Sequence, residues 1–187
     1  RGEADADTIA FTRNAAHYKC SHLVEHPIGE YDFSLMRNFL FNHAEHLRFE
    51  MLASSSISQL AFLAKKYKGE IKYHTMHSNT WIKQLGLANE ESHARMQTAL
   101  NETFNLALGI FEESEFALML NEMNAFEGER ALQEMWFETI TPLLESASLK
   151  IPSISLLQPA YGGRKGYHTE YLQPLLDEMG AVFRLDP

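Results

Sequence analysis

The chain has 187 residues, of which 45% are hydrophobic and 22% charged, which is enough for one domain with a substantial core. No run of about 18 apolar residues occurs, so a membrane-spanning helix is excluded, and the net charge of -9 is spread along the chain, which argues against nucleic acid as a partner. With a single cysteine, Cys20, no intramolecular disulfide can form, and we expect a cytoplasmic protein.

The N-terminal third carries a weak helical pattern followed by a strong one. Residues 5–18 have a weak apolar face, and the Pro27 and Gly29 region interrupts the chain after it. The next helix is expected over 32–52, and apolar residues surround most of its circumference. Such a helix is buried on several sides, in a bundle or at a subunit interface. One line along it passes through Asn42 and His46, so we expect polar side chains in the middle of a buried face.

The longest expected helix covers residues 57–85, a rod of about 43 Å at about 1.5 Å per residue. Ser54, Ser55 and Ser56 are expected to cap its start, and Gly86 marks its expected end. His74 and Ser78 interrupt its apolar face, and a buried polar group must be hydrogen-bonded, ligated or functional. The predicted face consists of Ile57, Leu60, Ala64, Tyr67, Ile71, His74, Ser78, Trp81 and Leu85.

The remaining pattern is also helical. Helices are expected over 89–111, with Asn89 as the N-cap, over 114–123, over 128–148 and, after a long loop at 150–168, over 169–183. There is no alternating strand pattern, nucleotide-binding glycine motif or internal repeat. The sequence therefore predicts a single all-α domain over residues 1–187, built as a helical bundle.

Inward-facing Glu and His residues could hold metal ions, as in ferritin-like carboxylate proteins, which use Glu-x-x-His pairs. Glu90 and His93 have this spacing, but they lie in a first helical turn, where acidic residues act as capping partners. Glu70 and His74 are better placed, yet Ile71 occupies the position three residues before His74. We therefore expect His74 to be a hydrogen-bonded core histidine.

Two further motifs leave alternatives open. Cys20 lies near His17 and His22, which permits a cysteine–histidine nucleophile, although a single cysteine on a short helix is more often a packing residue. The glycine-rich stretch from Gly162 to Gly166 can wrap an anion through backbone N–H groups, with Arg164 and Lys165 adding charge, or form a simple surface turn.

Four segments carry a resemblance to a known family. They are residues 38–41 (NFLF), 70–74 (EIKYH), 90–97 (EESHARMQ) and 162–170 (GGRKGYHTE). In the same order, they resemble the PaaC-type subunits of phenylacetyl-CoA epoxidase. The resemblance implies a ferritin-like bundle within a bacterial multicomponent monooxygenase that converts phenylacetyl-CoA to its ring 1,2-epoxide. It also implies that a related partner subunit holds the di-iron site and that this chain holds no cofactor of its own.

The ligand positions of the catalytic relative fall on Asn42, Ile71 and His74 of this sequence. Two of these three residues cannot supply the negative charge that a di-iron centre needs, so the resemblance implies a vestigial site. The alternative function is a metalloprotein with its own site, built from His46, Glu50, Glu70 and His74. Ile71 discriminates between the two, because a working site needs a carboxylate there.

The resemblance also implies that the first helix pair of the bundle is absent from this sequence. The expected helices at 32–52 and 57–85 would then expose more apolar surface than a monomer tolerates. Either the first helix pair exists as a cleaved or separately encoded piece, or a second copy of the chain covers this surface across a two-fold axis. Of these two we expect the homodimer, with Leu35, Phe39, Tyr67 and Trp81 strongly buried, in addition to a complex with the catalytic subunit.

Overall fold

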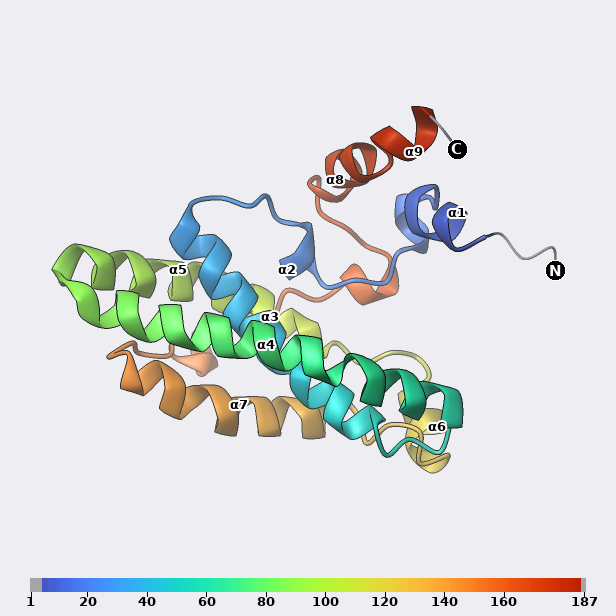
Figure 1. Ribbon diagram of the computed structural model, residues 1–187, viewed down its shortest axis with the longest axis horizontal. Coiled ribbons are helices and arrows are strands. Elements are labelled where there is room, and N and C mark those ends of the chain that lie inside the picture. The colour runs from blue at the N-terminus through green and yellow to red at the C-terminus, as the bar shows by residue number, and fades with distance from the viewer. Residues whose placement is uncertain (1–4, 186–187) are drawn as a thin grey trace.

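Helix α3 (Tyr31–Leu52) lies at the centre of a helical bundle and packs against the three other long helices (Figure 1). These are α4 (Ser58–Ala88), α5 (Glu90–Leu108) and α7 (Glu129–Ser146). The computed structural model describes residues 5–185, apart from the side chain of Ile154, and none of these residues forms a strand. The predicted all-α bundle is confirmed.

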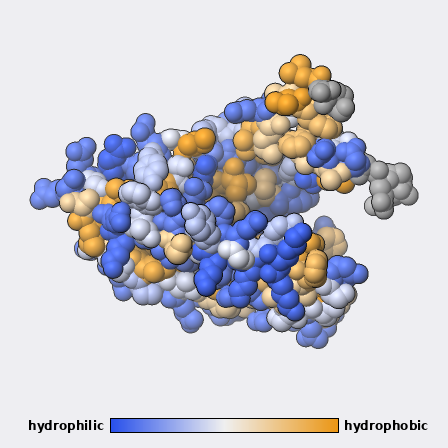
Figure 2. Space-filling view, in the orientation of Figure 1, coloured by the Kyte–Doolittle hydropathy of each residue, from blue (hydrophilic) through white to orange (hydrophobic). Residues whose placement is uncertain are grey.

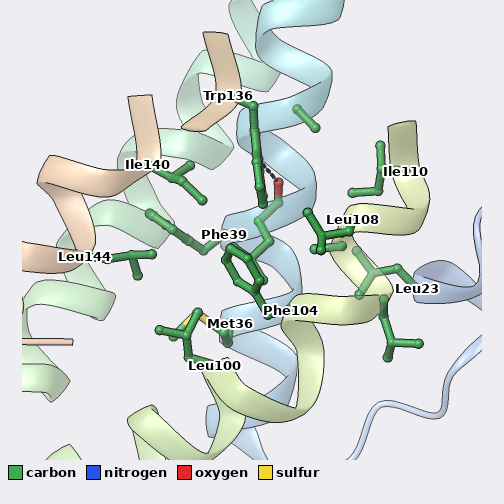
Figure 3. Packing of buried hydrophobic residues seen from close by; sticks show 14 of the residues in the cluster. Leu23, Met36, Phe39, Leu100, Phe104, Leu108, Ile110, Trp136, Ile140 and Leu144 are labelled. Atoms are coloured by element: carbon green, nitrogen blue, oxygen red, sulfur yellow. Dashed lines mark hydrogen bonds between the residues drawn. The ribbon is translucent and has the colours of Figure 1, made fainter. Parts of the chain in front are cut away.

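The core lies where α3, α5 and α7 meet. Phe39, Phe104 and Trp136 are fully buried there (Figure 3), and the Trp136 indole N–H donates a hydrogen bond of 3.0 Å to the Leu40 carbonyl. That bond satisfies the one polar group of the indole, so the ring can be buried without a desolvation penalty. The Trp136 ring also packs against Phe104 and Phe111, with ring centroids 5.7 and 5.1 Å away.

Helix α4 buries a different face from the one that its sequence predicts. Ala64, Ile71, Ser78 and Leu85 are buried or half-buried as expected, but Tyr67 and Trp81 are 40% and 38% exposed and His74 is exposed. The second buried row lies one position further along, at Ala61, Thr75, Ile82 and Gly86. Small residues dominate this face and allow α4 to approach its neighbours closely. The predicted burial of Leu35 and Phe39 is confirmed, whereas Tyr67 and Trp81 are not buried within this chain.

Gly86 does not end α4, contrary to the prediction. The helix continues to Ala88, and a Cβ atom built on Gly86 would lie 2.5 Å from the Ala147 carbonyl oxygen of the chain after α7. The residue is therefore a contact point between helices and not a terminator. The predicted serine cap of α4 is wrong: the N-cap residue is Ile57, no side chain caps the helix, and the Ser55 hydroxyl accepts a hydrogen bond from the Ile57 N–H, which precedes the helix. Asn89 caps α5 as predicted.

The shorter expected helices are broken into smaller pieces. Residues 5–18 contain two separate turns of helix, and 169–183 contains two short helices where one was expected. Short helices form only where packing supports them, and Phe11 of the first turn packs against Phe183 near the C-terminus, with ring centroids 5.7 Å apart. The short elements are α1 (Ala6–Phe11), η1 (Ala15–His17), α2 (His22–Glu25), η2 (Gly109–Phe111), α6 (Ala117–Glu122), η3 (Ile154–Leu156), η4 (Gly163–Lys165), α8 (Leu172–Met179) and α9 (Ala181–Leu185).

Elements from the two ends of the chain lie together beside the bundle, where α1, α8 and α9 form a small lobe (Figure 1). The outer surface of this lobe is apolar over α8 and α9 (Figure 2), where Met179, Val182 and Leu185 are exposed. None of the helices among residues 5–185 is long and apolar enough to cross a membrane.

Candidate functional site

The three positions that match metal ligands of a catalytic relative lie on α3 and α4. Asn42 and Ile71 are half-buried, whereas His74 is on the exposed side of α4. Asn42 is neutral and Ile71 has no ligand atom, so these positions offer no carboxylate for a metal ion. The expectation that His74 is a core histidine is wrong.

The alternative ligand set is only partly assembled. His46 and Glu50 face each other on α3, with the His46 Nε2 atom 3.7 Å from the Glu50 Oε1 atom, but Glu70 and His74 are exposed on α4. The same Glu50 oxygen lies 2.8 Å from the Lys68 ammonium. That contact holds the pKa of Glu50 below its ordinary value, against the opposing effect of burial. Lys68 therefore neutralises this carboxylate from within the chain.

The hydrogen-bonded core histidine of this region is His43. Its Nε2 atom lies 2.7 Å from the Asn79 Oδ1 atom of α4, and burial lowers its pKa, so the ring is neutral at pH 7. The Nδ1 atoms of His43 and His46 are buried without a hydrogen-bond partner. Thr75 and Ser78 bond to carbonyls of their own helix, those of Lys72 and Thr75.

A di-iron centre does not fit the residues at these positions. Two metal ions in a ferritin-like bundle are held by several inward-facing carboxylates together with histidines. Here Glu50, the carboxylate of the alternative ligand set that is half-buried, is bound by Lys68, and a positive charge at that point repels a metal cation. Within residues 5–185, the one group of three ligand-type side chains close enough to share an ion lies elsewhere, at Cys20, Glu25 and His168.

This second cluster joins the start of the chain to its C-terminal segment. Glu25 is 1% exposed, and its Oε1 atom lies 2.7 Å from His168 Nδ1. Its Oε2 atom accepts hydrogen bonds of 2.8 Å from the backbone N–H and the hydroxyl of Thr169. Burial opposes the charge on Glu25, but these hydrogen bonds outweigh it and hold the pKa of the carboxyl below its ordinary value.

The cluster is held together by hydrogen bonds within the chain and is not a nucleophile site. His168 Nε2 lies 3.1 Å from the Tyr18 carbonyl oxygen and Nδ1 lies 2.7 Å from Glu25, so both ring nitrogens are engaged by groups of the chain itself. The Cys20 thiol is 3.8 Å from Glu25, and burial together with that carboxylate raises its pKa to about 11. Cys20 is therefore a protonated thiol, and no cysteine–histidine nucleophile forms.

The glycine-rich loop does wrap an anion, and the anion is part of the chain. The backbone N–H groups of Gly162 and Arg164 donate to the buried Glu112 carboxylate at 2.8 and 3.2 Å. The Lys165 ammonium lies 3.6 Å from the other carboxylate oxygen. A buried carboxylate needs such donors to remain charged. The loop is thus an internal anchor.

A third buried network extends this anchor into the bundle. The carboxylate of Glu129 on α7 binds two guanidinium groups, those of Arg48 on α3 and Arg164 on the loop. Arg48 also pairs with Glu45, and Arg164 donates to the Ile110 carbonyl oxygen at 3.2 Å. The network holds α3, α7 and the C-terminal loop in one arrangement.

Comparison with known proteins identifies the family of this chain. All of residues 1–187 match the family described as phenylacetic acid catabolic protein. The chain belongs to that family. It is 32% identical over 188 residues to the C subunit of 1,2-phenylacetyl-CoA epoxidase from Escherichia coli (strain K12), an alignment that covers 100% of this chain and 74% of that protein. The family that the four sequence segments indicated is confirmed.

The buried acids of this structure were not predicted from the sequence. Glu25, Glu112 and Glu129 are buried acids with partners far along the chain, and nothing near them in sequence marks them as special. Two of their partners, Arg164 and His168, do lie in the segment 162–170 on which the resemblance partly rests. The family resemblance therefore marked the loop that holds these partners, but it did not mark the three buried acids.

Proposed function

We propose that this chain is a non-catalytic structural subunit of a multicomponent phenylacetyl-CoA 1,2-epoxidase that acts in aerobic phenylacetate degradation in the cytoplasm. The proposal is supported by family membership and by the similarity to the C subunit of the Escherichia coli epoxidase. In this role the chain holds a related di-iron catalytic subunit in its active arrangement. The electrons come from a separate reductase.

The observation that carries the non-catalytic role is the composition of the α3–α4 surface. Oxygen activation by a di-iron centre needs several negative ligands, and Asn42 and Ile71 stand where two of them are expected. Glu50 is occupied by Lys68. A subunit that keeps the bundle without the ligands can still supply a complementary surface for its catalytic relative.

The second candidate function is a metalloprotein with its own site. One observation favours it, the proximity of the half-buried His46 and Glu50 on α3. Because Glu70 and His74 are exposed, such a site would need further ligands from another chain. Activity measurements on the isolated chain separate the two functions.

The test is reconstitution from purified components. The chain alone, supplied with phenylacetyl-CoA, oxygen and reducing equivalents, is expected to form no epoxide. The catalytic subunit with its reductase is expected to turn over at full rate only when this chain is added and to co-elute with it. Epoxide formation by this chain alone would establish the metalloenzyme instead. A catalytic subunit that is equally active without this chain would contradict the structural role.

A further inference from the structure

Three side chains of metal-binding type meet between the start of the chain and its C-terminal loop. The Sγ atom of Cys20, the Oε1 atom of Glu25 and the Nδ1 atom of His168 all lie within 4.8 Å of one another. The Glu25 and His168 side chains are 0% and 7% exposed, while Cys20 is half-buried. A thiolate, an imidazole and a carboxylate are the ligand types that zinc binds in proteins.

The spacing of the three atoms suits a tetrahedral metal ion. Zinc lies about 2.0 to 2.3 Å from each ligand atom, so two of its ligand atoms are about 3.5 Å apart. Here Cys20 Sγ lies 3.8 Å and His168 Nδ1 lies 2.7 Å from Glu25 Oε1. Movements of about 1 Å in these side chains would therefore bring all three atoms to zinc-binding distance.

Both buried side chains already make the outer hydrogen bonds of metal ligands. The Tyr18 carbonyl oxygen can only accept, so His168 Nε2, 3.1 Å away, is the donor and Nδ1 is left for the interior of the cluster. Thr169 donates its N–H and its hydroxyl to Glu25 Oε2 at 2.8 Å, which leaves Oε1 for the interior. Histidines that bind metals almost always donate their second N–H to such an acceptor, and ligating carboxylates are hydrogen-bonded in turn.

The charge of the cluster balances a divalent ion. A thiolate and a carboxylate together carry two negative charges, so a zinc ion makes the buried group neutral. Within the described residues no lysine or arginine forms an ion pair with Glu25, in contrast to Glu50 beside Lys68. The thiolate favours zinc over magnesium, calcium and manganese, and ferrous iron binds such ligands more weakly than zinc does.

We propose that Cys20, Glu25 and His168 bind one zinc ion, with a water on the half-buried Cys20 side as the fourth ligand. Binding releases the thiol proton to solvent. The ion is structural, because it joins positions 143 residues apart in the chain, and closing so long a loop stabilises the fold. The loop already packs on the cysteine, since a Cβ atom added to Gly163 would collide with the Cys20 carbonyl oxygen. The site stands independently of the epoxidase role.

Zinc loading of the chelator-stripped chain tests the site. After incubation with Zn²⁺ and gel filtration, elemental analysis should give close to one zinc per chain. Free Zn²⁺ at about 100 times its dissociation constant should raise the melting temperature by about 5 to 10 °C. Co²⁺ in place of Zn²⁺ should give a thiolate-to-cobalt charge-transfer absorption, which reports directly on ligation by Cys20.

Variants separate the ligands from their surroundings. Cys20→Ala should raise the zinc dissociation constant at least about 100-fold and abolish the cobalt absorption, while circular dichroism shows that the chain remains folded because the bond between Glu25 and His168 is intact. Thr169→Val, which removes one outer hydrogen bond, should raise the constant about tenfold. His22→Gln is the matched control and should leave it unchanged, because that half-buried histidine bonds to the Tyr167 carbonyl oxygen.

Three results would overturn the proposal. The first is a wild-type chain that retains no zinc after gel filtration and melts at the same temperature with and without Zn²⁺. The second is a Cys20→Ala variant that binds zinc as tightly as the wild type, which would place the ion at other histidines. The third is a cobalt-loaded wild type without the charge-transfer absorption.

Discussion

Buried carboxylates, and not the histidines of α4, are the residues on which this structure depends most. Glu25 is the clearest case, because its two oxygens receive a ring N–H, a backbone N–H and a hydroxyl from residues 168 and 169. Each of these donors would be left unpaired if the carboxylate were lost. Removing one partner of a buried hydrogen bond is costly because the polar group that remains stays buried and unpaired.

His168→Gln should therefore lower the free energy of unfolding by about 2 kcal/mol, the typical cost of losing a buried hydrogen bond to a charged group. Urea denaturation followed by circular dichroism measures this change. His22→Gln is the matched control, since that histidine is only partly buried and makes a single bond to the Tyr167 carbonyl oxygen. A loss below about 1 kcal/mol for His168→Gln would show that the pair is no stronger than a surface contact.

Acid should remove the contribution of Glu25 in a defined direction. Its pKa is lowered in the folded chain from an ordinary value of 4.5, so its stabilisation is complete above pH 4.5 and disappears as the pH falls through the folded value. The stability difference between the wild type and Glu25→Gln should thus be constant near pH 7 and shrink below pH 4.5. Urea midpoints measured from about pH 7 to about pH 3 provide the comparison. A stability difference that grows on acidification would show that the charged form of Glu25 does not stabilise the fold.

At the scale of helices, α4 contains two glycines in opposite environments. Gly86 touches the Ala147 carbonyl region, whereas an added Cβ on Gly69 would meet nothing within 4 Å. Gly86→Ala should destabilise the chain by about 2 kcal/mol through overpacking. Gly69→Ala should stabilise it by up to about 1 kcal/mol, because alanine is the better helix former.

Thermal unfolding of the two alanine variants gives opposite shifts in melting temperature if the packing of α4 is correct. The pair is a sharp comparison because both changes add the same methyl group to the same helix. Similar shifts for both variants would mean that Gly86 and Ala147 are not in contact.

The sequence predicted the long helices because their periodicity is strong, and it misjudged which side of α4 is buried. Hydrophobicity favoured the large residues Tyr67 and Trp81, whereas packing selected the small residues Ala61 and Thr75, since small side chains permit close helix contacts. The short terminal helices depend on tertiary contacts and leave a weak local pattern. Glu25 escaped prediction because His168 is 143 residues away.

For the whole molecule, the composition of the α3–α4 surface has a direct analytical consequence. The chain, exposed to ferrous iron without oxygen and then gel-filtered, should retain far less than one iron per chain, because Asn42 and Ile71 supply no charge and Lys68 occupies Glu50. Elemental analysis by mass spectrometry measures this. The purified catalytic subunit, loaded in the same way, is the positive control. Retention near two irons per chain would show instead that this chain has a di-iron site of its own.

The two tryptophans of the chain lie in different environments and should give distinguishable fluorescence. Trp136 is fully buried against aromatic rings with its N–H satisfied, while Trp81 is 38% exposed on α4. Emission from Trp136 should be blue-shifted and insensitive to acrylamide, and emission from Trp81 red-shifted and easily quenched. Trp81→Phe and Trp136→Phe isolate each signal. Tryptophan fluorescence can therefore report separately on unfolding of the core, through Trp136, and on binding of a partner to the exposed side of α4, through Trp81, without an added label.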